Sequence, residues 1–296
     1  MQEVLTIFTP TYNRQDTLPR LYESLCNQTS YRFKWLVVDD GSTDNTESLI
    51  KKWVLDKRIK IRYYKQSNMG KAMAHNKGVE LSETELFVCV DSDDYLTSEA
   101  VVIIIYTWEY IKDKNYVGIL AYRGRHGGGE ITQCRKKIES ATLRNSYRKY
   151  VLVGDTMLIY KRELLLKYPF PFFEGEKFVP ESYLYDRIDT VGKLYFIHKI
   201  LYIGEYLENG YTKNMRKVIK KNPNGYIEYI NYRIKIENGI ISKCTDILRY
   251  IAVAKCKCLR VNKIIEQSVS PFLTIILYPL GLFFYIKLYK KIGEGL

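Results

Sequence analysis

The stretch Leu86-Phe-Val-Cys-Val-Asp-Ser-Asp-Asp94 decides the fold of this chain. Five apolar residues are followed at once by three carboxylates, which is typical of a buried strand that ends in a polar turn. Carboxylates at positions i and i+2 point to the same side where a strand ends. Mg²⁺ and Mn²⁺ prefer carboxylate oxygens and usually bind one or two of them together with substrate phosphates. The stretch therefore predicts that Asp91 and Asp93 hold one of these ions, while Asp94 is in position to cap the helix that follows.

Upstream of this stretch, short apolar runs alternate with amphipathic ones. The pattern predicts strands over residues 4–9, 34–39, 59–64 and 86–91. Helices are expected over residues 17–28, from 43–46 onward, over 71–81, and from Thr97, as its cap, to about residue 111. Alternating strands and helices favour an α/β fold of βαβ units with a mainly parallel sheet. Such open sheets bind ligands at the carboxyl ends of their strands.

Polar residues stand at these strand ends, but the two common phosphate-binding glycine motifs are absent. No G-x-G-x-x-G follows the first strand, and no G-x-x-x-x-G-K-[ST] occurs. A nucleotide would therefore be held in another way. Asp39 and Asp40 can accept a hydrogen bond from the imide N–H of a base, and Gly41 permits close approach of the backbone. Lys71, at the start of a predicted helix, suits a phosphate group.

The second half of the sequence changes in character. A strand is expected over residues 151–160, a helix over 181–191, and mostly helical, basic sequence over 210–260. From Phe272 to Ile286 there is no charged residue, and lysines follow. At about 1.5 Å of rise per residue, this run is shorter than a hydrocarbon core of about 30 Å. A helix that lies on a membrane surface or re-enters it, with a basic flank, is favoured; a core helix is the alternative.

Composition narrows the partners. The formal net charge is +13, and a basic excess suits nucleic acid, an anionic membrane surface or a phosphorylated substrate. No nucleic-acid-binding module is recognisable, so we expect membrane lipid and phosphate rather than DNA or RNA. The 6 Cys residues lack the spacing of a disulfide framework or a zinc site, and no cleavable signal peptide begins the chain. Reduced thiols in the cytoplasm are therefore expected.

Four segments, in this order, carry a family resemblance: Thr9-Pro-Thr-Tyr-Asn-Arg14, Val37-Val-Asp-Asp-Gly-Ser-Thr-Asp-Asn-Thr46, Asn68-Met-Gly-Lys-Ala-Met-Ala-His-Asn-Lys-Gly78 and Val90-Asp-Ser-Asp-Asp94. Together they resemble the family 2 glycosyltransferases, with their GT-A fold, over roughly residues 3–200. The family is inverting, which implies a single displacement by an acceptor hydroxyl that a carboxylate deprotonates. The resemblance therefore implies an enzyme that takes its sugar from a nucleotide sugar.

The resemblance also assigns roles to individual residues. The first segment and the Asp pair would bind the nucleoside, and the third segment would line the donor. Asp91 and Asp93 would hold the metal, Mg²⁺ or Mn²⁺, and the diphosphate. The expected donor-binding set is Thr9, Pro10, Tyr12, Arg14, Asp39, Asp40, Asn68, Gly70, Lys71, Asp91 and Ser92.

The general base departs from the family pattern. Family members usually carry a Glu-Asp pair before a helix, with the Asp as base. The matching stretch here is Gly175-Glu-Lys-Phe-Val-Pro-Glu-Ser182, where Ser182 occupies the position of that Asp. A base must lie within hydrogen-bond reach of the hydroxyl and be ionised. We expect Glu181 to take the role, with Glu176 and Asp186 as other candidates.

Three parts are expected along the chain. Residues 1–205 would form the GT-A catalytic domain that binds the nucleotide sugar, residues 206–268 a helical, basic extension, and residues 269–296 an apolar tail that associates with a membrane. Within the first part, Asp155 and Ser182 are possible acceptor contacts.

The sequence thus predicts an inverting glycosyltransferase that moves a sugar, from a UDP-sugar foremost, to a hydroxyl of a lipid-linked or polysaccharide acceptor. It would be cytoplasmic and peripheral to the inner membrane through its tail. One alternative is a non-catalytic scaffold that binds sugar nucleotides during polysaccharide assembly. The other is a sugar nucleotidyltransferase, although that class opens with a glycine-rich loop where this chain has TPTYNR.

Overall fold

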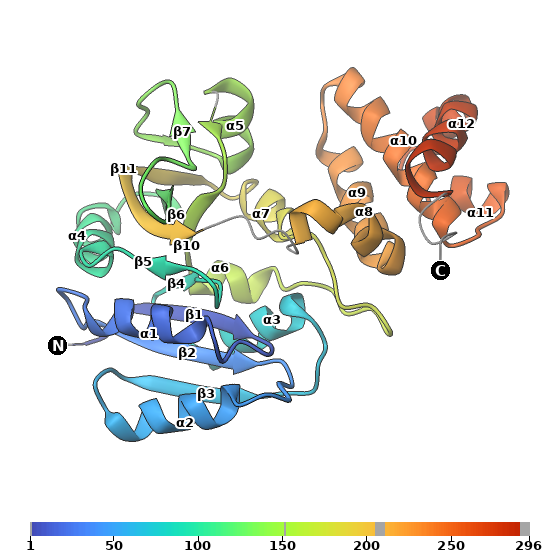
Figure 1. Ribbon diagram of the computed structural model, residues 1–296. Coiled ribbons are helices and arrows are strands. Elements are labelled where there is room, and N and C mark those ends of the chain that lie inside the picture. Colours follow the sequence, from blue (N-terminus) through green and yellow to red (C-terminus); the bar gives the residue numbers. More distant parts are fainter. Residues whose placement is uncertain (1, 151, 205–210, 291–296) are drawn as a thin grey trace. The chain divides into compact units, whose positions relative to one another are not determined.

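The computed structural model describes residues 2–150, 152–204 and 211–290 (Figure 1). The chain forms two compact units: residues 1–169 with 184–205, and residues 170–183 with 206–296. The first unit is built around one large sheet, and the second consists mainly of helices. The segment 170–183, which we assigned to the catalytic domain, thus groups with the helical unit.

The elements of the first unit alternate for most of its length. Its strands are β1 (Leu5–Thr11), β2 (Phe33–Asp39), β3 (Ile61–Lys65), β4 (Leu86–Cys89), β5 (Tyr95–Leu96), β6 (Tyr116–Arg125), β7 (Gln133–Cys134), β8 (Ser140–Ala141), β9 (Leu152–Val153), β10 (Thr156–Lys161) and β11 (Lys193–Gly204). Its helices are α1 (Leu18–Cys26), α2 (Thr46–Asp56), α3 (Lys71–Leu81), α4 (Ala100–Ile111), α5 (Leu143–Lys149), α6 (Arg162–Lys167) and α7 (Ser182–Ile188), which begins in the segment 170–183.

The large sheet has the strand order β3-β2-β1-β4-β10-β6-β11-β5, and β8 also pairs with β11. The strands β3, β2, β1 and β4 run parallel, as do β6 and β11. β10 is inserted antiparallel between β4 and β6, and the short strands β5 and β8 are antiparallel to β11. The predicted α/β fold with a mainly parallel sheet is confirmed. The antiparallel β10 could not be read from its sequence, because direction is decided by its neighbours.

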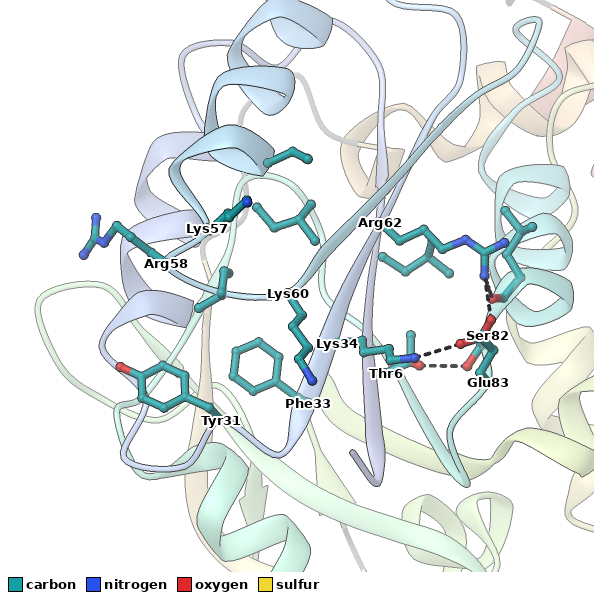
Figure 2. A pocket seen from close by; sticks show the side chains of 15 residues that line it. Thr6, Tyr31, Phe33, Lys34, Lys57, Arg58, Lys60, Arg62, Ser82 and Glu83 are labelled. Carbon is teal, nitrogen blue, oxygen red and sulfur yellow. Dashed lines mark hydrogen bonds and ion pairs between the residues drawn. The ribbon is translucent and has the colours of Figure 1, made fainter. Parts of the chain in front are cut away.

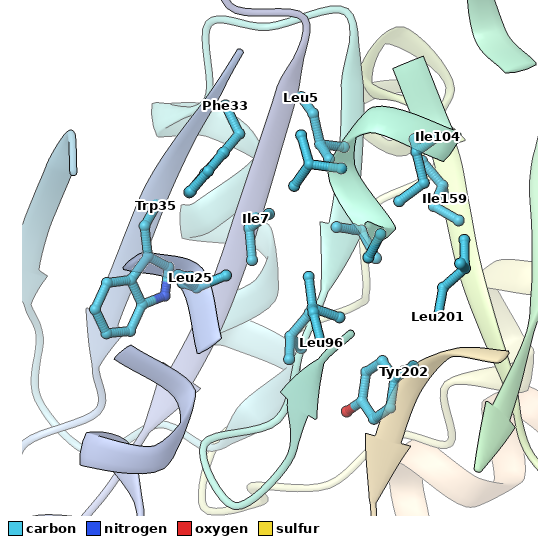
Figure 3. Packing of buried hydrophobic residues seen from close by; sticks show 14 of the residues in the cluster. Leu5, Ile7, Leu25, Phe33, Trp35, Leu96, Ile104, Ile159, Leu201 and Tyr202 are labelled. Carbon is cyan, nitrogen blue, oxygen red and sulfur yellow. The ribbon is translucent and has the colours of Figure 1, made fainter. Parts of the chain in front are cut away.

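One face of the sheet carries the main hydrophobic core (Figure 3). Leu5 and Ile7, two positions apart on β1, point to this same face because side chains alternate between the faces of a strand. Both are fully buried. The helices α1, α2 and α4 cover this face with Leu25, Trp53 and Ile104, among others. The intervening side chains of β1 point to the opposite face.

The helix α3 packs on that opposite face. Phe8 stacks on Phe87 with ring centroids 5.2 Å apart, and His75 meets both rings edge-on. A Cβ atom at Gly78 would lie 2.4 Å from the Phe8 ring, so only glycine allows α3 to approach so closely. This packing fixes α3 with its N-terminus at the carboxyl edge of the sheet.

Two expected helix caps are wrong. α4 begins at Ala100 after Glu99, and no side chain caps it; the carbonyl of Thr97 merely accepts from the Ala100 N–H (3.1 Å). Asp94 does not cap this helix either, because its carboxylate is bound elsewhere in the unit. At α2, the Asp44 carboxylate accepts from the Thr46 N–H (3.0 Å).

The second unit confirms the predicted helical C-terminal region. Its helices are α8 (Tyr211–Lys221), α9 (Pro223–Ile236), α10 (Ile240–Cys256), α11 (Val261–Glu266) and α12 (Pro271–Tyr285), which continues as the π-helical turn η1 (Ile286–Lys290). α10 packs between α9 and α12. Glu176, from the segment 170–183, accepts from the N–H groups of Asn224 and Gly225 (2.8 Å each) at the start of α9.

The helix from Pro271 to Lys290 has 20 residues, or about 30 Å at 1.5 Å per residue. Among the described residues it alone is long and apolar enough to cross a membrane by length and composition. It is longer than the charge-free run from which we argued, so length does not exclude a spanning helix. One of its faces packs on α10, where a Cβ atom at Gly281 would lie 2.6 Å from Ile251.

The other face of this helix carries a row of exposed apolar side chains at helical spacing, which we name the apolar stripe. It consists of Phe272, Ile275, Ile276, Leu280, Phe283 and Ile286, each between 45% and 73% exposed. Exposed Lys287 and Lys290 follow at its end.

Candidate functional site

Loops after β1 and β2 are tied together at the carboxyl edge of the sheet. Asn13 N–H donates to Ser42 Oγ (2.9 Å), and Thr43 N–H donates to Asn13 Oδ1 (2.8 Å). Arg14 N–H donates to Thr46 Oγ1 (3.0 Å). Asn13 has a φ of 52°, a conformation that Asn tolerates better than most residues. The segments that carry TPTYNR and DDGS therefore form one continuous rim.

The Asp39 carboxylate is fully buried within this rim. Its Oδ1 accepts from Ser42 N–H and its Oδ2 from the Tyr63 hydroxyl, both at 2.7 Å. Burial, and then the bond to this carboxylate, raises the pKa of Tyr63, so the hydroxyl remains a donor. Asp39 thus holds the loop after β2 on β3, and its predicted contact with a nucleobase stays a prediction.

Asp40 connects the rim to the start of α3. Its Oδ1 accepts from Gln66 Nε2 (2.8 Å) and Met69 N–H (2.9 Å), and its Oδ2 accepts from Gly70 N–H (2.7 Å). Each carboxylate oxygen offers about two acceptor positions, so Oδ2 keeps one. Gly41 allows the approach: its φ is +86°, and a Cβ atom there would lie 3.0 Å from the Asn68 nitrogen.

Two buried polar atoms beside Asp40 have no hydrogen-bond partner within the described part of the chain. They are Thr11 Oγ1 and Gln66 Oε1. Asp40 N–H donates to the Thr11 carbonyl, and Gln66 donates to the Asp40 carboxylate, so both residues adjoin it. Buried polar groups are almost always satisfied, and unsatisfied ones call for a ligand or water. Thr11 lies within TPTYNR but is not in the expected donor-binding set, and Gln66 stands in none of the four segments.

Asp91 lies among positive charges. Lys71 Nζ, in the first turn of α3, is 2.6 Å from Asp91 Oδ1. Burial raises the pKa of the Asp91 carboxyl, but the attraction of Lys71, and then of Arg123 and Arg14, outweighs it and leaves the pKa below its ordinary value. Asp91 is therefore an anion, as a metal ligand must be. Three of the predicted site residues, Arg14, Lys71 and Asp91, come together here.

Asp93 has a carboxylate that is partly exposed and meets no donor among residues 2–150, 152–204 and 211–290; only its backbone carbonyl is engaged, by Arg20. Ser92 between the two Asp residues is buried. Within those same ranges no group of three or more His, Cys, Asp or Glu side chains could hold a metal ion. Two carboxylates fit a divalent cation that takes its other ligands from a diphosphate and water.

Asp94, the third carboxylate of the turn, points into the protein. Its Oδ2 accepts from the Tyr202 hydroxyl (2.7 Å) and pairs with Arg123 Nη2 (2.6 Å). Burial, which exceeds the attraction of Arg123, raises the pKa of Asp94 to about 6. Arg123 and Tyr202 come from β6 and β11, and neither carries a sequence motif that could have marked it.

The other residues predicted to bind the donor differ in how far their side chains are exposed. Thr9 is fully buried, and its Oγ1 accepts from Trp35 Nε1 (3.0 Å), so its hydroxyl is engaged within the protein, and its part in donor binding stays a prediction. Tyr12 is 46% exposed on the rim, and Pro10 is half-buried beside it. Asn68 is half-buried, and Gly70 begins α3 with a φ of +90°.

The predicted base and acceptor residues belong to different units. Glu181 and Ser182 are exposed and lie in the segment 170–183 of the helical unit, whereas exposed Asp155 lies in the first unit. Asp186 is half-buried in α7 of the first unit. Both carboxylate oxygens of Glu176 accept backbone N–H groups of α9, so Glu176 serves the fold and is not a free base.

A pocket of about 740 Å³ lies at the other edge of the sheet (Figure 2). Thr6, Phe33 and other residues near the amino ends of the strands line it. Lys34 and Arg62 point into it but both pair with Glu83, at 2.7 and 3.2 Å. It contains none of the predicted site residues, and open α/β sheets bind ligands at the opposite, carboxyl ends. We therefore assign the site to the carboxyl edge.

Several known proteins are similar to this chain in sequence. Glycosyltransferase GlyG of Streptococcus pneumoniae is 24% identical over 217 residues, which cover 69% of this chain and 71% of GlyG. Poly(ribitol-phosphate) beta-N-acetylglucosaminyltransferase TarS of Staphylococcus aureus is 24% identical over 215 residues, covering 70% of this chain and 37% of TarS. An uncharacterized glycosyltransferase of Rickettsia bellii is 38% identical over 90 residues, covering 30% of this chain and 13% of that protein. The matched part of the chain thus spans about a third of the length of TarS. It spans less than a sixth of the length of the Rickettsia protein.

Solved structures share the fold. S. aureus TarS 1–349 in complex with UDP-GlcNAc superposes with a TM-score of 0.63 at 17% identity, over 96% of this chain and 92% of that one. The mannosyltransferase PcManGT from Pyrobaculum calidifontis, in complex with GDP-Man and Mn²⁺, gives a TM-score of 0.58 at 15% identity, over 96% and 81%. The GT-A fold that the sequence predicted is therefore the fold of this chain.

The family model of glycosyl transferase family 2 matches residues 6–168. This range holds the rim, the start of α3 and the Asp91–Asp93 turn, and it covers more than half of the chain. The chain therefore belongs to glycosyl transferase family 2, whose members transfer sugars from nucleotide sugars.

Proposed function

We propose that this protein is an inverting glycosyltransferase that moves a sugar from a nucleotide sugar, a UDP-sugar foremost, to a hydroxyl of a glycan or lipid-linked acceptor. One observation carries the proposal: Asp91, two residues before Asp93, pairs with Lys71 and is attracted by Arg14 at the carboxyl edge of a GT-A sheet. This is an arrangement of opposite charges that suits a diphosphate and a cation.

The nucleoside would bind against the rim. Tyr12 offers an exposed ring for stacking, and Asp40 keeps one acceptor position for a base N–H. Thr11 and Gln66 add two unsatisfied polar atoms next to Asp40. We therefore assign base recognition to Asp40 rather than to Asp39.

The diphosphate would lie between the start of α3 and the Asp91–Asp93 turn. Lys71 and Arg14 would neutralise phosphate charge, and a helix N-terminus favours anions. Asp91 and Asp93 would hold Mg²⁺ or Mn²⁺, which would supply further neutralisation of the leaving diphosphate.

The reaction would be one displacement. The acceptor hydroxyl gives its proton to a carboxylate, its oxygen bonds to the anomeric carbon, and the bond from that carbon to the diphosphate breaks with inversion. We assign the proton to Glu181, which is exposed, since Glu176 is committed to α9. Asp155 and Ser182 are proposed acceptor contacts.

The acceptor is proposed to be a surface polysaccharide or its lipid-linked precursor. The name of TarS describes transfer to a poly(ribitol-phosphate), and chondroitin and hyaluronan synthases of Pasteurella multocida are similar to part of this chain. The apolar stripe and the lysines after it support attachment to the inner membrane surface from the cytoplasm.

The decisive experiment measures nucleoside diphosphate released from a panel of UDP-, GDP- and dTDP-sugars, with Mn²⁺ or Mg²⁺ and membrane lipid extract. We expect metal-dependent release from one donor, reduced about 100-fold or more in Asp93→Asn and Glu181→Gln. Asp113→Asn, an exposed carboxylate beyond the end of α4, should behave as wild type.

Each other result has a distinct meaning. Release that survives Glu181→Gln moves the base to another carboxylate, with Asp186 next. Nucleotide binding without release from any donor contradicts catalysis and leaves the scaffold alternative. An NMR spectrum of the product that shows retained anomeric configuration rejects inversion.

A further inference from the structure

A cluster of three side chains lies directly behind the Asp91–Asp93 turn, and the proposed reaction assigns it no task. It consists of Asp94, Arg123 and Tyr202. Asp94 and Tyr202 are 4% and 2% exposed, and the Arg123 side chain is 17% exposed. We name it the support cluster.

The support cluster reaches the turn through one hydroxyl. Tyr202 Oη accepts from the backbone N–H of Asp91 (3.0 Å) and donates to Asp94 Oδ2 (2.7 Å). Because the Asp94 carboxylate accepts the hydroxyl proton, the oxygen lone pairs of Tyr202 remain directed at Asp91. Both ends of the turn are thereby held by one side chain.

Arg123 completes the arrangement. Its Nη2 pairs with the same Asp94 oxygen (2.6 Å), and its guanidinium carbon lies 4.0 Å from the centre of the Tyr202 ring. The two residues face each other on paired strands, Arg123 on β6 and Tyr202 on β11. The register between these strands shifts just before Tyr202, and such irregularities re-aim side chains.

Glycine at position 204 makes room for the pair. A Cβ atom there would lie 2.6 Å from Asp94 Oδ1 and 2.7 Å from Arg123 Nη2. Two strands, a glycine and a buried charge pair therefore converge on one backbone N–H. An ordinary surface turn is stable without such an arrangement. A turn that must present two carboxylates in fixed directions requires it.

We propose that Asp94, Arg123 and Tyr202 are positioning residues that fix the backbone of Asp91 so that Asp91 and Asp93 share one divalent cation. This inference rests on the proposed function, because it assumes that the cation binds there with the nucleotide. It extends that function to residues that touch neither cation nor donor.

The test measures Mn²⁺ binding without catalysis, from the electron paramagnetic resonance signal of free Mn²⁺ in the presence of UDP. Tyr202→Phe removes only the hydroxyl and keeps the ring under Arg123. We expect about tenfold weaker Mn²⁺ binding, as is usual when an outer-shell partner of a metal ligand is lost. Asp94→Asn should act in the same direction. Tyr195→Phe, on the same strand outside the cluster, should bind as wild type, and thermal melting checks that each variant folds.

Unchanged Mn²⁺ affinity in Tyr202→Phe overturns the inference. So does a lower melting temperature with unchanged affinity, because the cluster would then serve stability alone. If the wild-type protein itself binds no Mn²⁺ with UDP, the metal of the proposed function fails as well. That failure is visible in the wild type and is distinct from a failure in the variant only.

Discussion

Asp39 and Asp40 adjoin each other in the sequence but hold different parts of the site. Asp39 bonds Ser42 and Tyr63 and is fully buried, whereas Asp40 bonds the loop that leads into α3. An Asp pair after a strand indicates a polar strand end, but the alternation of side chains sends the two carboxylates in different directions. We therefore propose that Asp39 shapes the loop against which the donor binds and that Asp40 contacts the donor.

The half-buried carboxylate of Asp189 gives a prediction on pH. Asp189 accepts from the N–H groups of Leu143 and Arg144 (2.8 and 2.7 Å) at the start of α5. Burial, which exceeds the effect of these bonds, raises its pKa from 3.8 to about 6. Because the folded pKa is the higher one, the contribution of Asp189 to stability is fully present below pH 4 and is lost as the pH rises through 6.

The Asp189→Asn variant should therefore become more stable to unfolding, relative to wild type, as the pH rises. We expect the difference in unfolding free energy between variant and wild type to change by on the order of 1–3 kcal/mol between pH 4 and pH 7. Urea unfolding at pH 4, 5.5 and 7 measures it. A difference that is the same at all three pH values would show that Asp189 has an ordinary pKa.

At the scale of elements, glycines decide how closely segments approach. Gly154, between β9 and β10, has a φ of +81°, and a Cβ atom there would lie 1.9 Å from the Ile131 carbonyl oxygen. Gly127, in the loop after β6, has nearly the same φ of +80° but no atom within 4 Å of such a Cβ. The two glycines share a left-handed backbone conformation. They differ only in whether an added Cβ atom would meet another atom.

Gly127→Ala should cost about 1 kcal/mol, from the left-handed conformation alone. Gly154→Ala should cost about 3 kcal/mol, because the strand ends must also separate. Thermal or urea unfolding of both variants measures the difference. Equal losses would mean that the chain around Gly154 and Ile131 separates without cost and that their close approach is unimportant.

At the scale of the whole molecule, the apolar stripe leads us to expect the protein at a membrane surface. A row of large apolar side chains is unusual on a surface that faces only water. Because the opposite side of the helix packs on α10 through Gly281, we expect the helix to lie along a membrane surface. The lysines that follow would favour anionic lipid.

Substitution of Ile276, Leu280 and Phe283 by Ser should reduce binding to phosphatidylcholine–phosphatidylglycerol vesicles about tenfold or more. Leu55→Ser, at an apolar residue of α2 that is 78% exposed, is the control and should leave binding unchanged. Co-sedimentation measures binding, and alkaline carbonate should release a helix that lies on the surface. Retention after carbonate would indicate a spanning helix, and equal binding of the triple variant would exclude the stripe as the anchor.

The sequence by itself determined the order of the main elements up to about residue 111, the mainly parallel sheet and the four segments at its carboxyl edge. These features depend on local periodicity and on motifs whose residues are neighbours in the chain. It also marked Asp91, Asp93 and Lys71 as site residues. In the structure, Lys71 Nζ lies 2.6 Å from Asp91 Oδ1.

Only the tertiary structure decided which polar side chains face the crevice. Thr9 is hydrogen-bonded to Trp35, and Glu176 is hydrogen-bonded to the start of α9. Asp94 is bound by Arg123 and Tyr202. Each of these partners is distant in the chain. The antiparallel β10 and the support cluster arise in the same way. A carboxylate looks the same in sequence whether it binds a ligand or a buried arginine, because that choice depends on strand pairing over more than a hundred residues.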